Sequence, residues 1–187
     1  MKDFKELIKF IFGFMPWILF LFFSGHTLVS LERAIIISVL ASLLFGFREL
    51  RRGVILQWAT LFFFIGCMIA VNLTGLLSIA NDMGIIANGF LALFIWVTIF
   101  TGRPFTLQYA RADLPKELWN DPKVISSCQL IAIVWAVLLT FSALAAYFRV
   151  LNPDVYPDGV YFDINIGIIL SGIIFTTLYK RHKRLQR

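Results

Sequence analysis

The sequence predicts an all-α integral membrane protein, and three observations lead to that fold class. The chain of 187 residues is 59% hydrophobic and only 15% charged, with a mean hydropathy of +0.83, whereas soluble domains carry roughly 25% charged residues. Six apolar segments are each about as long as a helix needs to cross a hydrocarbon core roughly 30 Å thick. Nearly all Lys and Arg residues lie in connections on one side of these segments. We therefore expect a bundle of six transmembrane helices that forms a single domain over residues 1–187.

The six predicted spans follow one another at short intervals. The first has a basic start and an apolar run like a signal peptide, but Pro16 interrupts the run and no small-residue cleavage pattern follows Phe23. We interpret it as an uncleaved span. In chain order, the spans are Leu7–Ser24, Leu31–Phe47, Val54–Leu73, Ile85–Phe100, Ser127–Phe148 and Phe162–Tyr179.

The positive charges predict the orientation of these spans. Of the 17 Lys and Arg residues, only Arg33 and Arg149 fall in connections on the predicted outer side. All the others, including those near both termini, fall on the opposite side. Because connections rich in Lys and Arg stay in the cytoplasm, we expect both termini inside and a multi-pass protein of the bacterial inner membrane.

The longest polar segment between two apolar ones is Phe100–Lys123. Pro104 follows Gly102 and Arg103, and proline at a first helical position is typical of a helix start. The residues after it alternate between apolar and polar types in a pattern that favours a short helix at the membrane interface. We expect this interfacial helix to lie between spans four and five.

Four arginines near the inner ends of spans could bind an anionic lipid headgroup. Two are in this segment and two are in the preceding inner connection; the set is Arg51, Arg52, Arg103 and Arg111. A lipid-binding or small transport protein that recognises such a headgroup is therefore one predicted function. The alternative is that these arginines only satisfy the positive-inside rule and anchor the bundle.

Small residues at four-residue spacing predict where helices pack closely, because they let backbones approach in lipid. Span two offers Ser38, Ser42 and Gly46, span five offers Ala132 and Ala136, and span six offers Gly167 and Ser171. These stripes could be seams within one bundle or the face of a homodimer.

Enzyme chemistry has little support in the sequence. His26 and His182 fall on opposite predicted sides, Cys67 and Cys128 lie in separate apolar runs, and none of the common hydrolase or metalloprotease motifs occurs. We expect no enzyme, no catalytic residue, no cofactor and no metal ion. The formal net charge of +6 follows the topology, so nucleic acid is not an expected partner, and membrane lipid is.

Several short motifs resemble the bacterial intracellular septation protein A family. The similarity rests on Gly102-Arg103-Pro104, Trp119-x-x-Pro122, Trp135-Ala136, Phe14-Met15-Pro16, Phe47-Arg48 and the run Tyr179-Lys180-Arg181-His182 after a last span containing Gly167. The resemblance implies a small inner-membrane protein of cell-envelope maintenance and division, acting through other envelope or division proteins and without established catalytic residues. Members are often drawn with five spans, and the outer loop Asn152–Gly159 is longer here.

The sequence as a whole therefore predicts a non-enzymatic structural or scaffolding protein of the cell envelope. Lipid binding or transport at the basic site is the alternative function, and a small channel is a third.

Overall fold

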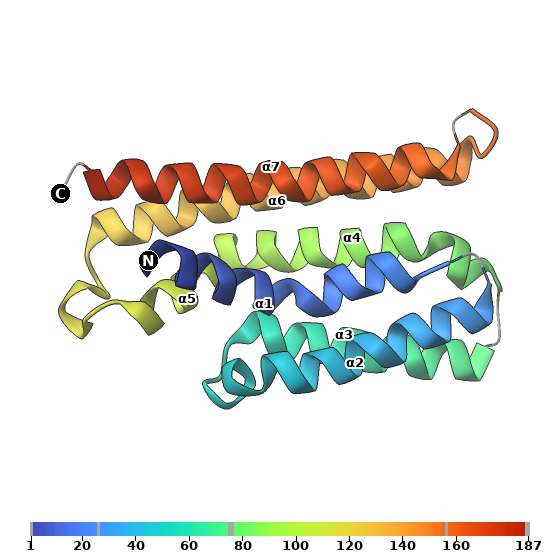
Figure 1. The fold of residues 1–187 in the computed structure, drawn as a ribbon, viewed down its shortest axis with the longest axis horizontal. Coiled ribbons are helices and arrows are strands. Elements are labelled where there is room, and N and C mark those ends of the chain that lie inside the picture. The colour runs from blue at the N-terminus through green and yellow to red at the C-terminus, as the bar shows by residue number, and fades with distance from the viewer. Residues whose placement is uncertain (1, 26, 75–76, 156, 186–187) are drawn as a thin grey trace. The chain divides into compact units, whose positions relative to one another are not determined.

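The computed structural model describes residues 2–25, 27–74, 77–155 and 157–185, and every regular element in these ranges is a helix (Figure 1). The predicted all-α class is therefore confirmed. In chain order, the elements are α1 (Lys2–Phe23), α2 (Leu28–Arg51), α3 (Ile55–Thr74), α4 (Leu77–Phe100), α5 (Phe105–Asp113), the short 3-10 helix η1 (Lys116–Leu118), α6 (Pro122–Leu151) and α7 (Asp158–Leu185).

Among the described residues, 5 helices are long and apolar enough to cross a membrane: α2, α3, α4, α6 and α7. They correspond to predicted spans two to six. The apolar part found in α1, Gly13–Phe23, is shorter than a span, so the first span and the count of six stay predictions. Large apolar side chains on these helices face outward, with Leu73 81% and Phe100 80% exposed. Surfaces of this kind suit lipid rather than water, so the chain is a multi-pass membrane protein by the length and composition of its helices.

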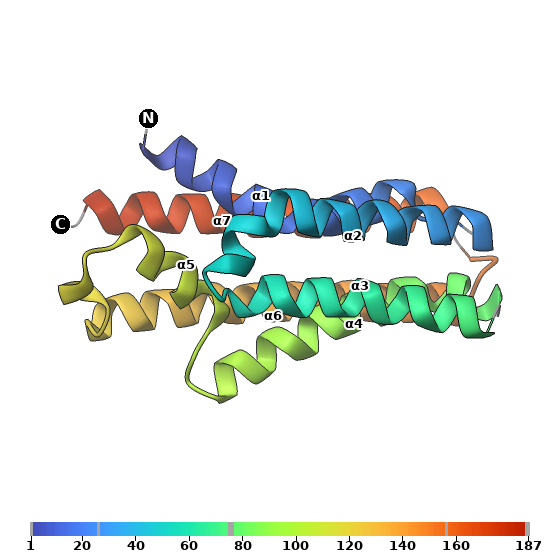
Figure 2. The same cartoon turned by 90° about the horizontal axis from the view of Figure 1, so that it is seen from below.

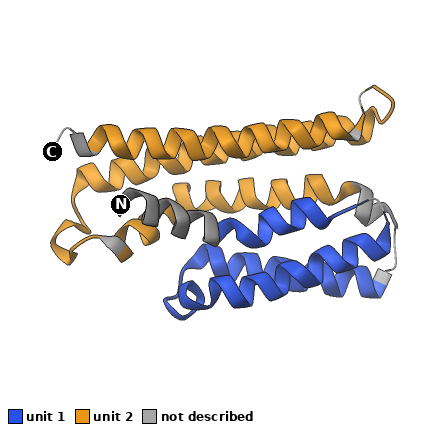
Figure 3. Cartoon of the chain, viewed as in Figure 1, with its two compact units in different colours: residues 1–81 blue, residues 82–187 orange. Residues whose placement is uncertain are grey.

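The chain packs as two compact units, residues 1–81 and residues 82–187 (Figure 3). We describe each unit by itself. The single domain over residues 1–187 stays a prediction.

In unit 1, α2 packs against both α1 and α3 (Figures 1 and 2). The Ser38 hydroxyl donates a hydrogen bond of 3.1 Å to the carbonyl oxygen of Pro16 in α1. The Trp17 indole N–H donates to the Thr60 hydroxyl at 3.0 Å, which links α1 to α3. Such bonds compensate for burying polar groups between apolar helices.

In unit 2, α6 and α7 run antiparallel along most of their lengths (Figures 1 and 2). Asn165 of α7 joins three helices, because its Oδ1 accepts hydrogen bonds from the Ser142 hydroxyl of α6 and from the Asn88 amide of α4, the latter at 3.4 Å. The Trp96 indole of α4 donates to the Thr140 hydroxyl of α6 at 3.2 Å. These polar contacts fix α4 against the α6–α7 pair.

Glycine ends α4 in a conformation that other residues adopt at a cost. Gly102 has φ +70°, its N–H donates to the Ile99 carbonyl, and the Arg103 N–H donates to the Thr98 carbonyl, both at 3.0 Å. This pair of bonds is the Schellman motif, which needs a left-handed residue after the helix. The end of α2 repeats it at Gly53, with φ +72°.

We expect Gly102→Ala to lower the free energy of unfolding by about 1–2 kcal/mol, the cost of a left-handed conformation for an L side chain. The measurement is thermal unfolding of the full chain in detergent. Gly89→Ala is the matched control, because Gly89 lies inside the same helix with nothing within 4 Å of an added Cβ. That variant should be neutral or slightly stabilising, and an equal loss in both variants would contradict the prediction.

Candidate functional site

Helix α5 is held between the end of α4 and the start of α6 by buried side chains and two hydrogen bonds. Thr98 at the end of α4 accepts a 3.3 Å bond from the Phe105 N–H, and the Thr106 hydroxyl donates to the Cys128 carbonyl at 2.7 Å. Leu107 is buried against Val124 and Cys128 of α6. The short helix predicted from the sequence therefore exists, with its apolar side turned to α6. Its place at a membrane interface stays a prediction.

Arg111, in the last turn of α5, lies against an aromatic ring. Its guanidinium carbon is 5.7 Å from the centroid of the Trp119 ring, and one Nη donates a weak 3.4 Å bond to the Trp119 carbonyl. The Trp119 indole N–H in turn donates to the Leu114 carbonyl at 3.1 Å. The 3-10 turn at η1 thus folds Trp119 back over Arg111 and holds the guanidinium in place.

The Arg111 guanidinium keeps hydrogen-bonding capacity that the other described residues leave unused. The side chain is half-buried, and its Nε is buried without a hydrogen-bond partner. Among the described residues, no carboxylate forms an ion pair with it. A guanidinium offers five N–H donors, and a buried donor without a partner costs about 1–3 kcal/mol. An anion supplied from outside the chain would neutralise the guanidinium charge.

Further cations share this end of unit 2. Lys116 and Lys123 are exposed on η1 and in the first turn of α6, and Arg103 is exposed just before α5. The Tyr179 hydroxyl of α7 donates a 3.4 Å bond to the Ser127 hydroxyl of α6. This bond brings Lys180, the next residue, to the start of α6 as well, and the views in Figures 1 and 2 agree that α5 and the end of α7 lie at the same end of α6.

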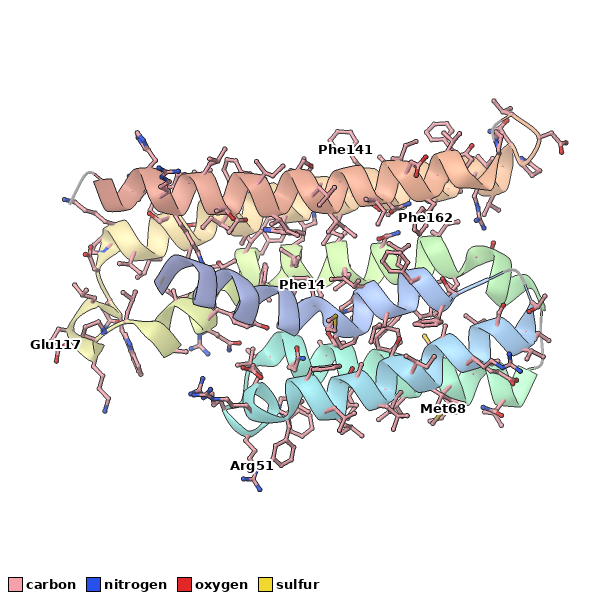
Figure 4. The ribbon with its side chains drawn as sticks, viewed as in Figure 1. Phe14, Arg51, Met68, Glu117, Phe141 and Phe162 are labelled. Atoms are coloured by element: carbon pink, nitrogen blue, oxygen red, sulfur yellow. The ribbon has the colours of Figure 1, made fainter. Side chains whose placement is uncertain are left out.

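The predicted set of four arginines is divided between the two units. Arg103 and Arg111 belong to unit 2, while Arg51 and Arg52 end α2 in unit 1. The Arg51 guanidinium carbon lies 4.5 Å from the centroid of the Phe47 ring, and its side chain extends away from the helices (Figure 4). Arg52 is exposed and caps α2 through its backbone N–H. We therefore treat each pair within its own unit.

Lys180 is a site residue that the sequence interpretation missed. It belongs to the basic run Lys180-Arg181 that follows Tyr179, and this run was the available signal. Which of its members reaches the start of α6 depends on how α7 packs.

Of the small residues predicted to pack between helices, those of α2 and α6 are buried and those of α7 are exposed. Those of α2 and α6 are buried: Ser38, Ser42, Gly46, Ala132 and Ala136. In α7, Gly167 and Ser171 are exposed, with nothing within 4 Å of a Cβ added at Gly167. The buried small residue there is Gly172, which lies against Trp135 of α6. Within unit 2, the α6–α7 seam therefore includes Gly172 rather than its two predicted neighbours.

No three His, Cys, Asp or Glu side chains form a group that could hold a metal ion among the residues the structure describes. His182 is exposed near the end of α7, while His26 lies outside the described residues. Cys67 and Cys128 are both free thiols.

The candidate site is therefore a basic, aromatic-lined end of a helical unit, with Arg111 at its centre. Comparisons with protein-family models, curated proteins and solved structures give no match to the chain, so the interpretation of this site rests on its geometry.

Proposed function

We propose that this chain is a non-enzymatic, multi-pass protein of the bacterial inner membrane that binds an anionic lipid headgroup at the α5 end of unit 2. The observation that supports the proposal is the half-buried Arg111 side chain, whose buried Nε has no hydrogen-bond partner and whose charge is paired with no carboxylate among the described residues. A protein that needed Arg111 only as a topological charge would leave it in solvent.

The chemistry of the site suits a phosphate group. Guanidinium binds phosphate through two parallel N–H···O bonds that a lysine cannot reproduce. Trp119 covers one face of the guanidinium, which limits its rotation and leaves the edge with the N–H groups to meet a ligand. In the proposed orientation, both termini and this end face the cytoplasm, where anionic lipid attracts each nearby Lys or Arg by about 1 kcal/mol.

Scaffolding in envelope organisation or division is the second candidate function. The exposed Gly167 and Ser171 on α7 favour it, because small residues let a helix from a second copy or another envelope protein approach closely. Such an association and lipid binding at the α5 end are compatible.

The test is native mass spectrometry of the full chain extracted gently from its own membrane. Wild-type protein should retain anionic lipid in a fixed ratio. Arg111→Gln should reduce retention by about tenfold or more, since hydrogen bonds to charged groups contribute about 1.5–3 kcal/mol. Arg111→Lys should recover little of this loss, because lysine lacks the planar fork.

Lys116→Gln is the matched control, since it removes one positive charge from the exposed η1 turn of the same segment. It should change retention little. Equal retention by the Arg111→Gln and Lys116→Gln variants would show that only general electrostatic attraction operates.

A further inference from the structure

Two neighbouring residues of α6 hold both of its partners at this end of unit 2. The Ser127 hydroxyl accepts a hydrogen bond from Tyr179 of α7 at 3.4 Å, and the Cys128 carbonyl accepts one from Thr106 of α5 at 2.7 Å. Because the two acceptors are adjacent in sequence, α5 and the end of α7 meet α6 at the same level. The side chains that follow, Arg111 on α5 and Lys180 on α7, therefore flank the start of α6.

Both helices that pack on the start of α6 carry a cation there, Arg111 on α5 and Lys180 on α7. Among the described residues, Lys180 and Arg111 are the charged groups that act electrostatically on the Cys128 thiol of α6. Two acidic residues of the connection between α5 and α6 have other positions. The Asp121 carboxylate caps α6 by accepting a 2.8 Å hydrogen bond from the Lys123 N–H. Glu117 is exposed on η1 (Figure 4). Neither forms an ion pair with Arg111 or Lys180 among the described residues.

We propose that the headgroup bound here is a phosphomonoester, gripped by Arg111 from α5 and by Lys180 from α7 across the first turns of α6. This inference rests on the proposed function and adds the class of ligand. A phosphomonoester carries about −1.5 to −2 charge at neutral pH and presents three terminal oxygens, whereas a phosphodiester carries a single negative charge. The guanidinium fork can take two of the oxygens, and the compact ammonium of Lys180 can neutralise the remaining charge.

The two cations have different roles in this arrangement. Arg111 recognises features that all phosphates share, so its loss weakens the binding of monoesters and diesters alike. Lys180 is the specificity-determining residue, because its charge matches the second negative charge that only the monoester carries.

The experiment measures the affinities of two lipids for the full chain in detergent by native mass spectrometry. The probes are short-chain phosphatidic acid, a monoester, and short-chain phosphatidylglycerol, a diester with matched acyl chains. Wild-type protein should bind phosphatidic acid about tenfold more tightly. Lys180→Gln should remove this preference, because it should weaken the binding of phosphatidic acid much more than that of phosphatidylglycerol, and Arg111→Gln should weaken both to a similar extent.

Lys183→Gln is the matched control, because Lys183 is an exposed lysine of the same helix, and it should keep the preference. Equal wild-type affinities for the two lipids would overturn the inference and leave the proposed function intact. Binding of neither lipid would overturn both. A preference that survives Lys180→Gln would also overturn the assignment of Lys180.

Competition with glycerol 3-phosphate distinguishes a lipid from a soluble source of the same chemistry. Retention of phosphatidic acid against an excess of the soluble monoester supports a lipid ligand. Displacement by it would support the phosphomonoester class and overturn the lipid source.

Discussion

Gly172→Ala is expected to lower the free energy of unfolding by about 1–3 kcal/mol, the usual cost of overpacking a tight interface. An alanine Cβ would lie 2.9 Å from Cη2 and 3.0 Å from Cζ2 of the Trp135 indole. The indole has little room to move, because Trp135 is only 3% exposed and its N–H donates to the Thr176 hydroxyl at 3.0 Å. The substitution must therefore either separate α6 from α7 or break this hydrogen bond.

Thermal unfolding of the full chain in detergent measures the effect. Gly167→Ala is the matched control on the same helix, since nothing lies within 4 Å of its added Cβ, and alanine improves helix propensity by up to about 1 kcal/mol. Adding Trp135→Phe to Gly172→Ala should recover part of the loss, because the smaller ring clears the new methyl group. The prediction fails if Gly172→Ala unfolds at the same temperature as Gly167→Ala.

Gln57→Met is expected to act in the opposite direction and to raise the free energy of unfolding by about 1–3 kcal/mol. Gln57 is 0% exposed, yet neither its Nε2 nor its Oε1 has a hydrogen-bond partner among the residues that the structure describes. Its side chain packs directly on Gly46 of α2, where an added Cβ would overlap it. Burying a carboxamide without partners costs about this amount, and methionine fills nearly the same unbranched volume without the penalty.

The comparison is with Gln57→Asn, which keeps the amide but shortens the side chain and should lower stability by leaving a cavity. Both variants are measured by thermal unfolding in detergent. Loss of stability in Gln57→Met would mean that the amide bonds to an ordered water or another group in the folded protein, and the prediction would then be wrong.

Hydropathy alone located the long helices but misjudged their ends. The third predicted span, Val54–Leu73, differs by one residue at each end from α3. For α6, however, the prediction began at Ser127, whereas the helix begins at Pro122 behind the Asp121 cap. The pair Asp121-Pro122 is typical of a helix start. The prediction missed it because the pair lies in a polar segment outside the apolar run that defined the span. The apolar run predicts the part of a helix that crosses the hydrocarbon core, and the helix itself can extend beyond that part at both ends.

The side of each helix that packs against its neighbours was harder to predict. Apolar residues surround α7 on all sides for most of its length, so periodicity could not distinguish the Gly167–Ser171 stripe from the one that contains Gly172 and Thr176. The same limit applies to the site. Residue type and position marked Arg111, but the ring of Trp119 and the approach of Lys180 depend on how η1 and α7 fold back onto α6.

In the proposed orientation, the length of α6 sets how deep in the bilayer the Arg111 end of unit 2 lies. Its 30 residues give a helix of about 45 Å at 1.5 Å per residue, against a hydrocarbon core of about 30 Å. The surplus of about 15 Å is comparable to the thickness of the two interfacial layers together. Since α5 is fixed to the first turns of α6, the proposed orientation makes the depth of Arg111 depend on hydrophobic mismatch. A thicker bilayer, or a stronger tilt of α6, would draw Arg111 towards the acyl chains, and a thinner bilayer would lift it towards water. If the proposed headgroup binds there, bilayer thickness would control its access to Arg111 without any change in the side chains themselves.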